Sequence, residues 1–440
     1  AVFTKILYVT KEKKHKAWRI FYWLGAGVLY AFVFMSIGRT AWVVSFLMGL
    51  VFLAWYCIYT GKKVFLRSGM LLLLCACLML PVTYGLVRYI PPVFHHPVWF
   101  WGEWDRDIKF REPEAMQRYE DELSDDIGFW NFIQYEFYTQ WGKLKAYANS
   151  NGIEIIGDIP IYMGYDSVDV WANQAEFQLD ENLTPVKVAG VPPDAFSDMG
   201  QKWGNPLYDW AKMENSDFGW WRMRMANSAR LYDIIRIDHF LGIIKYYTIP
   251  YEMPDARQGS YEQGPGQKLL DAINESIGDK KIIAEDLGVC MPEVDQILKD
   301  NNYPGMKVLE FAFGGDRKNP HLPYNYTNNC VCYGGTHDNE TLLGFFNDRN
   351  DGELGYAFDY LDTRDRYRMV DMVFRAAYSS VAVLTIFAVQ DILKLDNSAR
   401  MNFPSSFGNN WKWRMQKGQL NWDHLNAMRY LASVFDRERN

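Results

Sequence analysis

The chain has 440 residues, 49% of them apolar and 22% charged, so it has room for two domains or for one large barrel with insertions. Its net charge of −7 is unevenly spread, because residues 1–97 carry eleven Lys or Arg and one acid, which leaves 35 basic and 52 acidic residues in 98–440. So acidic a body argues against nucleic acid as a partner, since phosphate binding needs clustered positive charge.

The first 97 residues are predicted to form a membrane-like helical segment. Three uncharged runs, 20–37, 41–60 and 70–87, are each about long enough to cross a bilayer. Basic residues precede the first run and separate the second from the third, which predicts that those two stretches face the cytoplasm. The alternative is a buried helical hairpin of a soluble protein. Residues 36–44 weakly resemble a transmembrane segment of O-antigen ligases or polymerases.

From about Trp99 the sequence predicts a parallel α/β fold. Polar helical segments at 112–122 and 129–149 lead into short apolar runs separated by helices such as 293–300 and 367–378. The runs lie at 153–162, 234–240, 281–287, 305–313, 330–336 and 381–389. Most are apolar over four to seven residues, as expected of strands buried on both faces. Strand alternating with helix about six times is typical of a parallel sheet.

Three of these runs end in a carboxylate within a polar stretch: Asp238, Glu285 and Asp338. In a (β/α)8 barrel the catalytic residues project from the carboxyl ends of different strands, so the three acids are expected to converge at one mouth. Cleaving a glycosidic bond with retention needs two carboxyl groups, one to attack the anomeric carbon and one to protonate the leaving oxygen. The pattern therefore favours carbohydrate chemistry.

Several longer words resemble glycoside hydrolase family 77, the amylomaltases or 4-α-glucanotransferases. They are GDIPIY at 157–162, YDSVDVW at 165–171, VAGVPPDAFS at 188–197, GQKWGNPLYDW at 200–210, PGMKVLEFAF at 304–313, QDIL at 390–393 and ARMNFPS at 399–405. Their order is that of the family, and together they run from about 99 to 414. The resemblance implies a TIM-type barrel that transfers α-1,4-glucan segments between maltooligosaccharides, without a cofactor.

The same resemblance implies the catalytic roles. Asp238 would be the nucleophile, Glu285 the general acid/base and Asp338 the group that stabilises the transition state. Arg236 stands two residues before Asp238, so on a strand it shares that face and should keep Asp238 ionised and oriented. A structural salt bridge within the barrel is the alternative for Arg236. Glu285 has to be protonated to act as an acid, so burial that raises its pKa is expected.

Substrate-binding roles are expected for Arg236 and for five further residues. His337 and Asn339 flank Asp338 and are candidates to bind sugar hydroxyls, although loop packing explains Asn339 equally well. Asp158, which closes its strand, is assigned to the sugar-binding floor. Asp194 and Phe196 lie in the loop that resembles the family's cover over the acceptor side, where Phe196 would stack on glucose. No metal-ligand spacing is evident among the six cysteines and seven histidines.

The front of the chain departs from the family. The first two barrel strands have no counterpart here, and the membrane-like residues 1–97 stand in their place. The expected organisation is therefore about three transmembrane helices followed by a partial catalytic barrel in 98–440. The family is cytoplasmic, whereas the N-terminal segment implies a membrane. Two alternatives to the transferase remain open: an α-amylase-like hydrolase, and a truncated or chimeric chain with the site residues but little activity.

Overall fold

The computed structural model describes residues 100–193, 197–288, 291–404, 406 and 408–438. All of them belong to the unit Val98–Asn440. The expected spans at 20–37, 41–60 and 70–87, together with the stretch likened to O-antigen ligases, lie outside the described residues. Over the part of the chain that is described, no helix combines the length and the apolarity needed to cross a bilayer.

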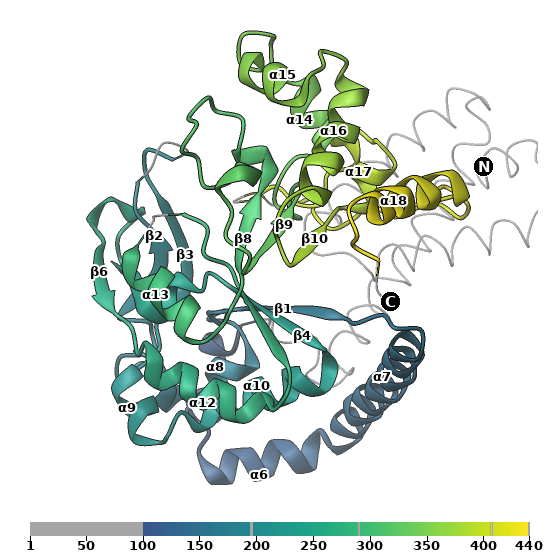
Figure 1. Cartoon of the computed structure of the whole chain (residues 1–440). Helices are drawn as coiled ribbons and strands as arrows, with labels where there is room; N and C mark the ends of the chain where they lie inside the picture. Colours follow the sequence, from purple (N-terminus) through teal and green to yellow (C-terminus); the bar gives the residue numbers. More distant parts are fainter. Residues whose placement is uncertain (1–99, 194–196, 289–290, 405, 407, 439–440) are drawn as a thin grey trace, which may run out of the picture. The chain divides into compact units, whose positions relative to one another are not determined.

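Six parallel strands form the centre of this unit (Figure 1). One sheet has the order β1-β4-β7, made of Ile156–Pro160, Ile234–Asp238 and Lys281–Ala284. A second has the order β8-β9-β10, made of Gly305–Val308, Cys330–Tyr333 and Leu384–Ile386. The two are continuous, because the amide of Ala284 in β7 donates to the carbonyl of Pro304 just before β8 at 3.0 Å. All six apolar runs predicted as strands are confirmed, although each strand is shorter than its run.

The strands separate three apolar layers. Inward-facing residues of β4, β7, β8 and β9 form one cluster that fills the interior: Ile234, Ile283, Met306, Val308, Val331 and Tyr333. Outward-facing residues such as Ile235 and Ile237 belong to a larger cluster under the helices of the first half. The helices of the second half cover a third cluster around Cys330 and Cys332. Alternation along each strand, with both faces buried, is the pattern of a TIM-type barrel.

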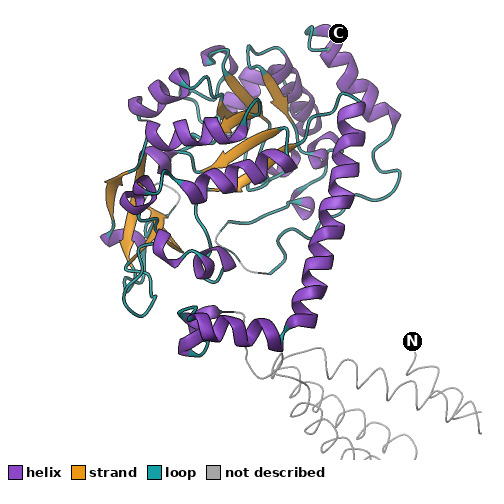
Figure 2. Cartoon of the chain, turned by 90° about the horizontal axis from the view of Figure 1, so that it is seen from below, coloured by secondary structure: helices purple, strands orange, loops and turns teal. Residues whose placement is uncertain are grey.

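Helices lie outside the strands and join them (Figures 1 and 2). In the first half, α10 (Gly219–Leu231) packs against α12 (Gln267–Ile277), and α13 (Pro292–Asp300) follows β7. In the second half α14 (Leu342–Asn347), α15 (Gly355–Leu361) and α18 (Trp422–Val434) all contact α16 (Arg366–Tyr378). The segments predicted as helices are confirmed as α6 (Pro113–Glu122), α7 (Ser124–Ser150), α13 and α16.

The segment between α10 and β4 packs closely against β1 because residue 157 is a glycine. A Cβ on Gly157 would lie 2.0 Å from the ring of Tyr232, which follows α10. Any larger residue at 157 would push this ring away from the strand, and with it the start of β4. The sequence analysis expected Asp158, the next residue, to close its strand. Asp158 is instead the middle residue of β1.

An antiparallel sheet was not predicted. Its order is β3-β2-β5-β6, with β2 Lys187–Val191, β3 Gln201–Pro206, β5 Lys245–Pro250 and β6 Ser260–Gln263. β2 and β3 belong to the excursion after β1, and β5 and β6 belong to the excursion after β4. The sheet therefore links two of the loops that leave the carboxyl ends of barrel strands.

Candidate active site

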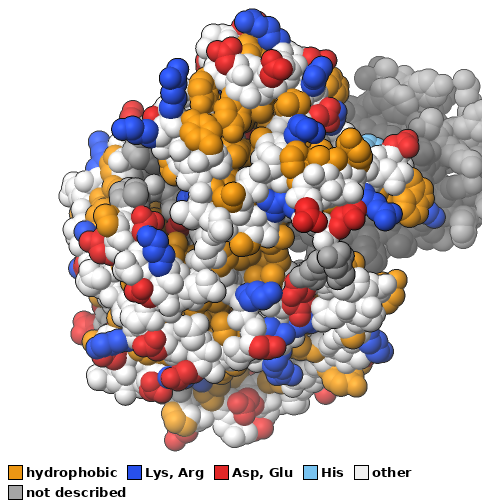
Figure 3. Space-filling view, in the orientation of Figure 1, with side chains coloured by type: hydrophobic (Ala, Val, Ile, Leu, Met, Phe, Trp, Pro, Cys, Tyr) orange, Lys and Arg blue, Asp and Glu red, His pale blue; other side chains and the backbone are white. Residues whose placement is uncertain are grey.

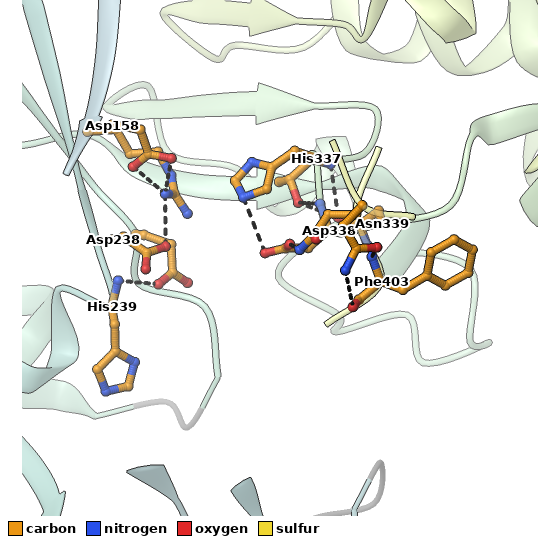
Figure 4. A network of polar contacts seen from close by, with 12 residues as sticks. Asp158, Asp238, His239, His337, Asp338, Asn339 and Phe403 are labelled. Carbon is orange, nitrogen blue, oxygen red and sulfur yellow. Dashed lines mark hydrogen bonds and ion pairs between the residues drawn. The ribbon is translucent and has the colours of Figure 1, made fainter. Parts of the chain in front are cut away.

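The site begins with an arginine that bridges two carboxylates at the end of the first sheet. The Nη1 atom of Arg236 lies 2.6 and 2.8 Å from the two oxygens of Asp158 and 2.9 Å from Oδ1 of Asp238. β1 and β4 run parallel, with Asp158 opposite Arg236, so the strand register brings the charges together. Asp158 and Asp238 lie side by side (Figure 4).

Charge and burial have opposite effects on the pKa values of Arg236 and Asp158. Burial alone would lower the pKa of Arg236, but the carboxylates of Asp158 and Asp238 more than offset it and raise that pKa. Partial burial raises the pKa of Asp158, against the opposing charge of Arg236. The guanidinium therefore stays charged and fixes the direction of the Asp238 carboxylate, while its Nε donates to Met306 Sδ at 3.3 Å.

Glu285 lies directly after β7, the neighbour of β4 in the sheet. Its side chain is 8% exposed, and its two oxygens accept hydrogen bonds from the amides of His239 at 2.7 Å and Leu287 at 3.0 Å. Burial, and then the charge of Asp238, raise its pKa to about 7, although Arg236 and the two amides oppose this. The carboxyl group of Glu285 thus contacts the residue next to Asp238 and holds its proton near neutral pH.

A turn in the left-handed region aims the amide of His239 at Glu285. The φ angle of His239 is 52°, a conformation that side chains with a Cβ rarely adopt. Its imidazole points away from Asp238 (Figure 4) and packs edge-on against Trp203 at 4.9 Å between ring centroids. Burial lowers the pKa of this imidazole to about 4, so His239 is neutral and its backbone makes the site contact.

Asp338 comes from the loop after β9, which two other residues hold in place. Asn402 Nδ2 donates to Asp338 Oδ1 at 2.6 Å, and Arg400 Nη2 donates to the backbone carbonyl of Asp338 at 2.7 Å. Nε2 of His337 lies 3.4 Å from the other carboxylate oxygen. Within the loop, the carbonyl oxygen of the Asn339 side chain accepts bonds from both the amide and the hydroxyl of Thr336.

A pocket of about 360 Å³ joins the two halves of the site. Asp158 and Arg236 line it from the first sheet, and His337 and Asn339 line it from the loop after β9. His337 is also an electrostatic neighbour of Asp158, whose pKa burial raises overall. Four of the six expected binding residues therefore line one pocket, although none of the three acids is itself among the lining residues. Asp194 and Phe196 lie outside the described residues.

Several contributors to this site had no assigned role in the sequence. Arg400 and Asn402 belong to the motif ARMNFPS at 399–405. This motif indicated the family, but nothing in it indicated that its side chains contact Asp338. The ring of Trp411 lies 5.1 Å from that of His337 and lines the pocket, and no sequence pattern singled it out. For Asn339 the contacts within the loop favour the packing role.

A buried pair of acids under the loop after β9 was also missed. Glu310 follows β8 and is 7% exposed, and its Oε1 has no hydrogen-bond partner in the described part of the chain. A Cβ added to Gly335 would lie only 2.6 Å from Oε1 of Glu310. Burial, then the charge of Asp391, raises the pKa of Glu310 well above its usual value. The glycine therefore lets the loop that leads to Asp338 pass directly over this acid.

Comparisons with known proteins agree with this geometry. The family model described as 4-alpha-glucanotransferase matches residues 85–421, which extends the expected range of 99–414 at both ends. A 4-alpha-glucanotransferase of Clostridium butyricum is 46% identical over 341 residues, covering 77% of this chain and 70% of the relative. One from Synechocystis is 45% identical over the same length, covering 67% of that protein.

A solved structure also matches. The amylomaltase of Streptococcus agalactiae, solved in complex with acarbose, superposes with a TM-score of 0.75 at 37% identity, covering 86% of this chain and 76% of that one. Neither these matches nor the described structure supports a membrane segment or a likeness to O-antigen ligases. The predicted enzyme class, a transferase acting on α-1,4-glucans, is confirmed. The chain belongs to glycoside hydrolase family 77, the 4-alpha-glucanotransferases.

Proposed function

We propose that Asp238, Glu285 and Asp338 are the working acids of a retaining transfer of α-1,4-glucan segments between maltooligosaccharides. The observation that carries this assignment is the contact between the Glu285 carboxyl and the amide of His239, the residue after Asp238. It joins two acids at the carboxyl ends of neighbouring parallel strands, with Ile237 opposite Ala284 in the register. Retention requires two carboxyl groups about 5–5.5 Å apart, as neighbouring strands allow.

The reaction takes two steps. The carboxylate of Asp238 attacks the anomeric carbon, and the proton of Glu285 goes to the glycosidic oxygen, which leaves as the 4-hydroxyl of the released glucan. Glu285, now ionised, then takes the proton of an incoming 4-hydroxyl, whose oxygen attacks the same carbon and frees Asp238. A pKa of about 7 suits a group that must both give and accept a proton.

The remaining residues orient the reactants. Arg236 directs the carboxylate of Asp238 and also pairs with Asp158, which combines the two roles considered for it, an orienting charge and a barrel salt bridge. Asp338, fixed by Asn402, faces the developing positive charge of the sugar ring. Asp158 and His337 bind hydroxyls from opposite sides of the pocket, with Asn339 contributing next to His337. Asp194 and Phe196 are proposed for the acceptor side on the family resemblance alone.

The proposed organisation keeps the sequence boundaries: a membrane-like segment in 1–97 and a partial barrel, without the family's first two strands, in 98–440. This arrangement leaves open two alternatives, a hydrolase that uses the same acids and a chain with little activity by itself. What distinguishes transfer from hydrolysis is the acceptor in the second step, since water and a sugar hydroxyl compete for the same intermediate.

Incubation with maltotriose separates these functions. Transfer gives a ladder containing products longer than maltotriose, whereas hydrolysis gives only glucose and maltose. We expect Asp238→Asn to lower the rate by about three orders of magnitude or more, because the amide cannot act as the nucleophile. Asp279→Asn, at an exposed aspartate of α12's following turn, is the matched control and should retain the rate. A ladder that survives unchanged in Asp238→Asn would refute the assignment.

A further inference from the structure

Lys, Arg, Asp and Glu side chains are spread over the visible face of the described unit (Figure 3). Among the residues that the structure describes, four charged residues are buried: Arg236, Glu285, Glu310 and Asp391. The first two belong to the candidate active site. Glu310 follows β8, and Asp391 lies in α17 (Val389–Ile392). Because burying an ionisable group is costly unless it is paired or neutralised, these two acids also need an explanation.

The two acids contact the two ends of the loop that carries Asp338. At the start of the loop, a Cβ added to Gly335 would lie 2.6 Å from Oε1 and 3.3 Å from Cδ of Glu310. At its end, Oδ1 of Asp391 accepts the amide of Leu342, the first residue of α14, at 2.7 Å. One buried acid therefore lies against each end of the loop.

Hydrogen bonds inside the loop connect its start to Asp338. Oδ1 of Asn339 accepts the amide of Thr336 at 2.9 Å and its hydroxyl at 2.8 Å. The same hydroxyl oxygen accepts the amide of Asp338 at 3.3 Å. Since Thr336 directly follows Gly335, a displacement of the backbone at Gly335 is passed through this hydroxyl to the backbone of Asp338.

The surroundings of Glu310 keep its carboxyl group neutral. Two acids, Asp391 and Glu340, oppose its ionisation, and two arginines, Arg349 and Arg400, favour it. Arg349 is engaged elsewhere, because its Nη1 donates to Oε2 of Glu340 at 2.8 Å. Burial is the largest effect, and together with the two acids it raises the pKa of Glu310 well above the usual value. The contact with the loop is therefore one of shape and not of charge.

We propose that Glu310 is a positioning residue for Asp338: its carboxyl group supports the start of the loop at Gly335, while Asp391 holds the other end at Leu342. Glu310 acts through the loop and does not touch the sugar. This role rests on the proposed function, in which Asp338 stabilises the transition state. It predicts that changes at Glu310 lower kcat and leave substrate binding nearly unchanged.

The first test measures disproportionation of maltotriose by the full chain. Glu310→Ala should lower kcat by about 10- to 100-fold, because a misplacement of about 1 Å can cost roughly 100-fold in rate. KM for maltotriose should change by less than about twofold, since the loss is in the transition state and not in uniform binding. Glu310→Gln keeps the shape of the neutral acid and should restore most of kcat.

A steric cycle tests the contact itself. Gly335→Ala should lower kcat as strongly as Glu310→Ala, because the new Cβ cannot fit beside the carboxyl group. The double variant should be no worse than either single variant, since removal of the carboxyl group leaves room for the methyl group. The matched control is Gly355→Ala at the start of α15, where an added Cβ meets no atom within 4 Å. Its kcat should be unchanged.

Hydrogen exchange of the backbone amides, followed by mass spectrometry, gives a readout that does not depend on activity. In Glu310→Ala the peptides covering 334–345 should exchange severalfold faster, because the loop has lost its support and opens locally. Peptides covering β4 should exchange at the original rate. Glu310→Gln should leave both sets of peptides unchanged.

These measurements separate the proposal from the function on which it rests. Unchanged exchange of the loop in Glu310→Ala, losses that multiply in the double variant, or a loss in Glu310→Gln equal to that in Glu310→Ala would overturn the positioning role. Faster exchange throughout the chain would also overturn it, because Glu310 would then be a general core residue. Faster exchange of the loop alone, without a fall in kcat, would leave the support by Glu310 standing and would count against the role of Asp338.

Discussion

At the scale of single residues, the site depends on how the protein separates the behaviour of two neighbouring acids. Asp238 is held by the permanent charge of Arg236, and its side chain is 43% exposed. Glu285 is buried, and the charge of Asp238 adds to the cost of ionising it. One acid is therefore paired with a fixed positive charge, while burial raises the pKa of its neighbour, which is the contrast that the proposed retaining transfer uses.

This division predicts a pH dependence. Because Glu285 must be protonated to release the first glucan, kcat/KM for maltotriose should fall about tenfold for each pH unit above a midpoint near 7. A profile that stays flat to pH 9 would contradict the role of Glu285.

A substrate that needs no acid gives the matched control for this profile. With maltosyl fluoride as donor, fluoride leaves without a proton, so the alkaline decline in the first step should disappear. Glu285→Gln should follow the same rule: it should lose most activity on maltotriose and retain the formation of the intermediate from maltosyl fluoride. Equal losses on both donors would point to a general disruption of the pocket.

At the scale of elements, Asp238 ends β4 and Glu285 directly follows β7, whereas Asp338 lies on a loop five residues beyond the end of β9. Its position depends on Asn402 and Arg400, which reach it from the segment after β10. We predict that Asn402→Ala lowers kcat by about 10- to 100-fold, since a hydrogen bond to a charged group contributes roughly 1.5–3 kcal/mol. KM for maltotriose should change little.

The control for Asn402 is Asn409→Ala, at an asparagine in the same segment whose side chain accepts an exposed bond from Lys412. Its kcat should match that of the unmodified chain. If Asn402→Ala raised KM as strongly as it lowered kcat, Asn402 would act by binding the sugar and not by positioning Asp338.

The parallel strands were predictable because strands buried on both faces have a distinct sequence pattern, a short apolar run followed by polar residues. β4 is an example, with Ile234 to Ile237 buried and Asp238 at its end. The antiparallel sheet was missed because its strands are short, mix polar with apolar residues and lie inside loops. The sequence motifs around Asp238, Glu285 and Asp338 indicated that these acids are catalytic candidates. The support from Asn402, Trp411 and Glu310 depends on contacts between distant segments, which no local pattern records.

At the scale of the whole molecule, apolar surface is distributed in two ways. The described unit has well-packed clusters, in which Trp221 and Tyr208 are completely buried. It also has α7, a helix rich in aromatic residues without a single buried position. Tryptophans in the two settings should therefore contribute very differently to the free energy of unfolding, even though their chemistry is the same.

This contrast gives a prediction for Trp221 and Trp130. Trp221→Ala should destabilise the chain by about 3–5 kcal/mol, the usual cost of removing a large buried ring. Trp130→Ala on α7, where the side chain is 62% exposed, should change the unfolding free energy by less than about 0.5 kcal/mol. Urea unfolding followed by far-UV circular dichroism measures both. A large cost of Trp130→Ala would contradict this prediction, because it would mean that the ring is covered in solution.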